Sequence, residues 1–153
     1  MAQLEVRAEG HVGAPAASVY RFIANFRDHH HRFLPPAFSQ FRVERGGIGA
    51  GTVATFRVTL GGVSQDYRTE VQEPEPGRVL TETDAHVGSF TTFTVTPEDG
   101  GSRVRIVTTW PSKGGVRGLF ERLIAPRMIR KLYNDELTLL DRYARSQTAA
   151  DQQ

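Results

Sequence analysis

The longest hydrophobic pattern in the chain lies near its C-terminus, over residues 115–146. Apolar side chains recur there at intervals of three and four residues, which places them in one wide stripe along an α-helix. Because such a stripe is buried against a partner surface, the pattern predicts a long helix packed on the rest of the chain. Pro126 interrupts the pattern and is expected to bend or divide the helix.

Most of the preceding chain alternates apolar and polar residues with the period of two that is typical of strands. Glycine pairs such as Gly61-Gly62 mark tight turns between these segments. Two short helices, over residues 15–26 and 28–34, are expected after the first strand. The pattern predicts about seven strands, over residues 4–12, 38–44, 54–60, 63–72, 78–86, 89–96 and 102–110.

This order of elements predicts an α+β fold in which short connections make the sheet antiparallel and its inner face wraps the terminal helix. We expect one domain over residues 1–147 and a disordered tail over residues 148–153. The facing of residues 78–86 stays open between two rows. One row is Val79, Thr81, Thr83 and Ala85, which we place inside; the other is Leu80, Glu82, Asp84 and His86.

Composition narrows the class of protein. The chain has 153 residues, of which 39% are hydrophobic and 24% charged, as in ordinary globular proteins. It has no cysteine, which excludes disulfides and thiolate metal sites. The formal net charge of +2 is too small to predict a nucleic-acid partner. The N-terminus shows no secretory signal and no segment is apolar enough to span a membrane, so we expect a cytoplasmic protein.

Several segments carry a resemblance to a known superfamily: GAPAASVYRFIANF after the first strand, the strand start at Gly51-Thr52, EPEPGRVLTET, FTTFTVTPEDGGSRVRIV and the long C-terminal helix. In these segments the chain resembles the START-like (SRPBCC) superfamily, and within it the polyketide cyclase/dehydrase-like branch. The resemblance implies a helix-grip fold, a curved sheet around the helix with a cavity between them. It also implies a hydrophobic or amphipathic ligand such as a lipid, a quinone or a polyketide-like compound. Turn and packing signatures specify a fold far better than a function.

The candidate ligand-binding residues lie in the inner rows of the predicted sheet and beside the helical stripe. Hydroxyl and amide groups among aromatic side chains are suited to orienting a ligand, although threonine also favours strands for its own sake. The sheet candidates are Phe56, Gln65, Tyr67, Thr69, Thr91, Phe93, Ile106, Thr108 and Trp110. The helix adds Arg127, Arg130 and Asn134, which are placed to hold a carboxylate or enolate oxygen unless they are ordinary surface residues.

Neither a metal site nor a catalytic pair is predicted. The three residues His29-His30-His31 point about 100° apart on a helix, so they cannot share a tetrahedral site, and we expect a solvated turn near the pocket rim. Alternation places Asp66 and Glu70 outside the sheet. Glu82, Asp84 and His86 would face the cavity only if residues 78–86 turn the other way.

Three function classes stay open. The leading hypothesis is a protein that binds a small hydrophobic ligand without a cofactor. The first alternative is a cyclase or dehydratase that uses the same cavity, with Tyr67 or substrate orientation as its means of catalysis. The second alternative is an interaction protein, because residues 113–131 carry six cations and one acid that would suit an anionic membrane or RNA. A transient membrane contact therefore stays open, and the sequence does not predict the oligomeric state.

Overall fold

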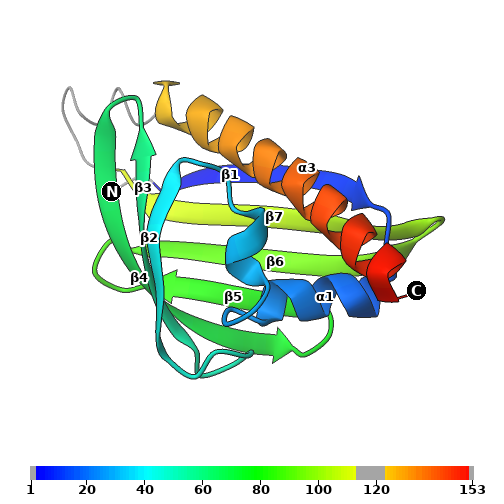
Figure 1. Cartoon of the computed structure of the whole chain (residues 1–153). Helices are drawn as coiled ribbons and strands as arrows, with labels where there is room; N and C mark the ends of the chain where they lie inside the picture. The colour runs from blue at the N-terminus through cyan, green and yellow to red at the C-terminus, as the bar shows by residue number, and fades with distance from the viewer. Residues whose placement is uncertain (1–2, 113–122, 152–153) are drawn as a thin grey trace.

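The computed structural model describes residues 3–112 and 123–151. Seven strands form one antiparallel sheet in the order β1-β7-β6-β5-β4-β3-β2, and helix α3 lies along its concave side (Figure 1). This arrangement confirms the predicted helix-grip fold. The elements are β1 (Gln3–Val12), α1 (Ala16–Ala24), the 3-10 helix η1 (His30–Phe33), β2 (Phe38–Arg45), β3 (Val53–Leu60), β4 (Val63–Glu75), β5 (Val79–Asp84), β6 (Ser89–Glu98), β7 (Gly101–Pro111) and α3 (Ala125–Asp151).

Turn residues and alternation explain why the strands pair as they do. Gly61 and Gly62 have φ angles of 58° and 81°, which are typical of the two-residue turns that join hairpin strands. The first strand joins the last, so that Val6 of β1 lies opposite Thr108 of β7. The predicted apolar rows of β1, β3, β6 and β7 all face the helices.

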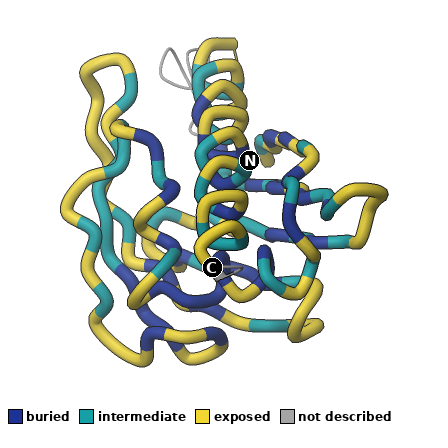
Figure 2. Tube along the Cα trace, turned by 45° about the vertical axis from the view of Figure 1, so that its right-hand side comes forward, coloured by how far each residue is buried: buried dark blue, intermediate teal, exposed yellow. Residues whose placement is uncertain are grey.

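The core fills the space between the concave side of the sheet, α1, η1 and α3. Large buried side chains are Phe22 of α1 and Phe26 of the turn after it, together with Phe33, Leu80 and Leu140 from η1, β5 and α3. Burial of one such side chain stabilises the fold by about 1.5–3 kcal/mol. Figure 2 shows buried positions recurring along one side of α3 while its other side stays exposed.

The bounds of α3 refine the prediction for the C-terminal helix. The helix begins at Ala125, so Pro126 lies in its first turn, where proline's missing N–H has no helical partner to lose. The expected stretch 115–122 lies outside the described residues. At the other end the helix continues to Asp151, and the Thr148 hydroxyl donates to the Ala144 carbonyl at 2.8 Å. Residues 148–151 are thus helical in this structure, whereas the sequence led us to expect a disordered tail from residue 148. None of the helices within 3–112 and 123–151 has the length and apolar character needed to cross a membrane.

The facing of β5 is the opposite of the one that we expected. Glu82 lies opposite Val71 of β4, and Leu80 lies opposite Phe93 of β6. Directly opposed residues of antiparallel strands share one face of a sheet, so Leu80 and Glu82 face the interior with these buried neighbours. The predicted inward row of Val79, Thr81, Thr83 and Ala85 is therefore wrong.

Asp84 also belongs to this row, but its carboxylate is used by the backbone. It accepts N–H groups from Arg68 at 2.8 Å, His86 at 2.9 Å and Val87 at 3.0 Å. These bonds tie the end of β5 to β4 and to the following turn. Asp84 is therefore a structural residue, and Glu82 is the acid of this strand that is left for the cavity.

Candidate ligand pocket

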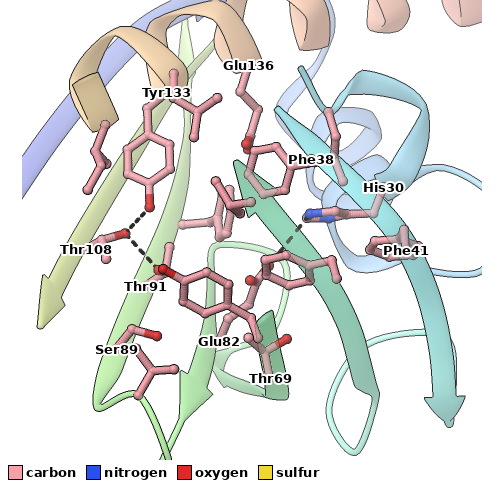
Figure 3. Close-up of a pocket in the computed structure, with 18 of the residues that line it drawn as sticks. His30, Phe38, Phe41, Thr69, Glu82, Ser89, Thr91, Thr108, Tyr133 and Glu136 are labelled. Atoms are coloured by element: carbon pink, nitrogen blue, oxygen red, sulfur yellow. Dashed lines mark hydrogen bonds and ion pairs between the residues drawn. The ribbon is translucent and has the colours of Figure 1, made fainter. Parts of the chain in front are cut away.

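A cavity of about 150 Å³ lies between the sheet and α3. One wall consists of aromatic rings from three neighbouring strands: Phe56 of β3 stacks on Tyr67 of β4 with ring centroids 5.3 Å apart, and Phe38 of β2 lies 5.5 Å from Phe56. Figure 3 shows the side chains that surround this space. Further apolar lining comes from Phe26, Leu34, Phe41, Val58, Leu60, Val87, Phe93, Trp110, Ile129 and Leu132.

A chain of three hydroxyl groups crosses from the sheet to the helix (Figure 3). Thr91 Oγ1 of β6 lies 2.7 Å from Thr108 Oγ1 of β7, which lies 2.6 Å from Tyr133 Oη of α3. Each hydroxyl has one proton to donate and two lone pairs, so the central Thr108 hydroxyl donates to at most one of its two neighbours. Burial raises the pKa of the Tyr133 phenol, which keeps it protonated and able to donate.

His30 forms part of the opposite wall. Its Nδ1 lies 2.7 Å from the Ile23 carbonyl oxygen, and because a carbonyl can only accept, Nδ1 carries the proton. Burial lowers the pKa of His30 to about 4, so the ring is neutral near pH 7 and Nε2 carries a lone pair. Nε2 lies 3.7 Å from Glu82 Oε1, beyond hydrogen-bond length. The ring also stacks on Phe26 with a centroid separation of 4.2 Å.

Two glutamates enter the pocket from opposite sides, Glu82 from β5 and Glu136 from α3 (Figure 3). Their residues are only 8% and 3% exposed. Burial raises the pKa of Glu82 to about 7. Burial, and then the nearby Glu82 carboxylate, raises the pKa of Glu136 to about 8. Both carboxyl groups therefore exchange protons near neutral pH.

Comparison with known families decides where this fold belongs. The family described as polyketide cyclase / dehydrase and lipid transport matches residues 3–145. The chain belongs to this family. A comparison with curated proteins gave no match.

Several solved structures share the fold of this chain. The KanY protein (ms6282) is 29% identical, with a TM-score of 0.84 over 95% of this chain and 99% of that chain. TTHA0849 from Thermus thermophilus is 20% identical, with a TM-score of 0.79 over 94% of this chain and 98% of that one. The Zhui aromatase/cyclase from Streptomyces sp. R1128 is 15% identical, with a TM-score of 0.74 over 96% of each chain. The last two likenesses concern the fold alone.

Most of the sheet residues predicted for the family's cavity do line it. They are Phe56, Tyr67, Thr69, Thr91, Phe93, Thr108 and Trp110. Ile106 is not among the residues that line the cavity and is buried in the core instead. Gln65 is exposed near the tip of the β3–β4 hairpin, where its amide donates to the Asp66 carbonyl at 2.9 Å.

The three helical candidates do not reach the cavity. Arg127, Arg130 and Asn134 are exposed, whereas Ile129 and Tyr133 are among the α3 residues that line it. Successive helical residues turn by about 100°, which carries these three side chains to the far side of α3. Their predicted contact with a ligand is therefore not supported by this geometry.

The sequence interpretation missed the ionisable lining groups. His30 is buried, so the expectation of a solvated histidine turn is wrong at this position, while its neighbour His31 is exposed. The sequence did hold a signal for the burial of His30: on a helix it would share one face with Phe26 and Phe33, which lie four residues before it and three after it. Among the described residues, no group of three or more side chains is arranged to hold a metal ion.

Glu136 had a similar signal. It lies four residues from both Leu132 and Leu140, which places it in the middle of the helical stripe. The expected absence of inward acid and base groups is therefore wrong, since His30, Glu82 and Glu136 all line the cavity.

Proposed function

We propose that this protein binds a small hydrophobic ligand that contains a ring, in the cavity between the sheet and α3. The observation that carries this proposal is the stacked pair Phe56 and Tyr67 facing a cavity that also contains the Thr91–Thr108–Tyr133 hydroxyl chain. Apolar walls with a few polar groups are the usual composition of small-molecule sites. The family's description, which includes lipid transport, is consistent with this proposal.

The size of the cavity limits the ligand. Pockets for drug-sized molecules have volumes of roughly 300–1,000 Å³, whereas an apolar cavity of about 150 Å³ accommodates benzene. The present cavity, also about 150 Å³, therefore accepts one ring in the arrangement described. A longer lipid, quinone or polyketide-like ligand requires the walls to separate.

The cavity would become larger if the β3–β4 turn moved away from α3. A methyl group added at Gly61, in the β3–β4 turn, would lie 3.1 Å from Met128 Cε of α3, so the turn lies close to the helix. Met128 is flexible and unbranched, which lets it change its rotamer with little cost. We infer that a larger ligand enters by displacing the hairpin from the beginning of α3.

Mass spectrometry of the purified protein, native and then denatured, tests the binding proposal. A retained mass that Val58→Phe removes is expected, because Val58 lines the cavity and the larger side chain fills it. Thr59→Phe is the matched control, since the neighbouring residue is exposed. An empty spectrum, together with no thermal stabilisation of the wild type by a set of single-ring compounds, would reject the proposal.

A second candidate function is proton transfer to or from the bound ligand, as in a cyclase or dehydratase. It is supported by the carboxyl group of Glu82, whose pKa near 7 suits a general acid or base and which lies beside His30 Nε2. The test incubates the retained compound with wild type and Glu82→Gln. Loss of product in the variant with binding unchanged supports catalysis, and equal amounts of product oppose a role for Glu82.

A further inference from the structure

The described lining of the cavity contains acidic side chains without basic ones of ordinary positive charge. Glu82 and Glu136 contribute two carboxyl groups, and no lysine or arginine occurs among the described lining residues. An ionised carboxylate in an apolar site is costly unless an opposite charge accompanies it. A bound ligand is a means of supplying that charge.

Of the two carboxyl groups, that of Glu82 has a buried oxygen that accepts no hydrogen bond from the described residues. Its side chain is 10% exposed, and Oε1 is buried without a hydrogen-bond partner in the described part of the chain. The nearest base, His30, cannot act as a counterion near pH 7, because its buried ring is neutral. An unsatisfied buried oxygen in a cavity wall is a position where a ligand donor gains a hydrogen bond at little cost.

Other titratable groups line the same cavity, and the neutral His30 Nε2 among them can only accept a hydrogen bond. They come from each neighbouring element: His30 from η1, Tyr67 from β4, and Tyr133 and Glu136 from α3. Tyr133 is already bonded to Thr108, and either carboxyl group, once ionised, would repel an anion. The faces of Phe56 and Tyr67 attract cations through the negative charge of their π-systems.

We propose that the ligand is a ring compound with a protonated amine, whose ammonium group lies between Glu82 and Glu136 while its ring packs on the Phe56–Tyr67 wall. This inference rests on the proposed binding function and specifies the ligand's chemical class. A fatty acid or another ligand with an anionic head group is disfavoured, because its charge would be buried where the described lining offers no lysine or arginine.

Binding of an ammonium group must also change the protonation of the site. The cation favours the ionised carboxylates, so it lowers their pKa and releases protons. Affinity therefore rises as pH increases from about 6 to about 8, the range in which burial places the two pKa values. A neutral ligand of the same shape shows no such rise.

Three probes of nearly equal size test this inference: benzylamine, benzyl alcohol and benzoate. Their affinities are measured by NMR titration of the ¹⁵N-labelled protein at several pH values. Benzylamine is expected to bind at least about tenfold more tightly than benzyl alcohol at pH 8, and benzoate more weakly than either.

Variants then locate the charge. Glu82→Gln and Glu136→Gln should each remove most of the preference for benzylamine over benzyl alcohol. Glu70→Gln is the matched control, because this exposed carboxylate lies on the other side of β4. Circular dichroism checks that each variant is folded.

The outcomes separate the two proposals. If none of the three probes binds, the ring-binding function itself fails. If benzyl alcohol binds and benzylamine has no advantage, or if benzoate binds best, the cavity binds rings but the amine inference is overturned. A preference for benzylamine that survives both glutamine substitutions would also overturn it.

Discussion

The imidazole Nε2 of His30 lies 3.7 Å from Oε1 of Glu82, and the two groups form no ion pair near pH 6. Burial lowers the pKa of His30 to about 4 and raises that of Glu82 to about 7, so both side chains are neutral between these values. Desolvation thus outweighs the attraction that the two charged forms would have for each other. The cavity holds its acid and base uncharged until a ligand or a pH change alters them.

We predict that His30 remains a neutral Nδ1–H tautomer down to about pH 4. The Ile23 carbonyl fixes the proton on Nδ1, and burial opposes protonation of Nε2. Long-range ¹H–¹⁵N NMR spectra distinguish the two tautomers and follow the titration. A His30 signal that titrates near the ordinary value, or a proton on Nε2, would contradict this prediction.

Glu136→Gln should flatten the loss of stability at alkaline pH. The carboxyl pKa is 4.5 in the reference state and about 8 in the fold, so between these values the folded protein holds more protons and its free energy of unfolding falls as pH rises. From about pH 6.5 to about pH 8.5 the wild type should lose about 1–2 kcal/mol more than the variant. This window lies above the range in which His30 acts in the opposite direction.

Urea unfolding at each pH measures this difference. Glu70→Gln should keep the wild-type dependence, because its carboxylate is exposed on the other side of the sheet. Parallel curves for wild type and Glu136→Gln would show that the carboxyl pKa is not raised in the fold.

Thr108→Val should destabilise the protein by about 1–3 kcal/mol. The substitution keeps the shape of the side chain but removes the hydroxyl that joins Thr91 to Tyr133. Thr59→Val is a suitable comparison: its hydroxyl bonds Ser64 in an exposed hairpin, so its loss should change stability by less than about 0.5 kcal/mol. Equal effects of the two substitutions on the unfolding free energy would argue against an ordered hydroxyl chain.

Adjacent glycines in the β6–β7 turn should differ sharply in their tolerance of alanine. A methyl group at Gly101 would overlap the Val12 carbonyl oxygen, whereas one at Gly100 would meet nothing within 4 Å. Gly100 has φ of 78°, so Gly100→Ala should cost only the left-handed strain of about 1–2 kcal/mol. Gly101→Ala should cost about 3 kcal/mol or more. Thermal melts compare the two, and similar melting temperatures would be the contrary result.

The parts of the fold that follow from hydrophobic period were predictable from sequence. Rows such as Val104, Ile106 and Thr108 alternate along strands with one wet face, so their facing could be deduced. In β5 the rule fails, because Thr81 on one face and Glu82 on the other are both buried. Charged residues usually mark the wet face of a strand, and here they lie on the interior face.

The site residues that the sequence did not predict lie in segments that are far apart along the chain. The neighbours of Glu82 and His30 in the cavity come from distant segments, and no local spacing in the sequence brings the two residues together. Arg130 lies near the stripe in sequence, yet the rotation of α3 on the sheet directs it outward. Aromatic and hydroxyl residues were predictable because they belong to regular strands, whereas the ionisable groups depend on how those strands and helices meet.

The pairing of β1 with β7 affects when the protein can fold during its synthesis. The N-terminal strand is made first, but its neighbour in the sheet is the last strand, and α3, which follows later still, also packs on β1. Contacts between distant parts of a chain form slowly, because closing the long loop between them costs conformational entropy before the contacts can stabilise the fold. A nascent chain therefore lacks a complete cavity until α3, which supplies one of its walls, has left the ribosome.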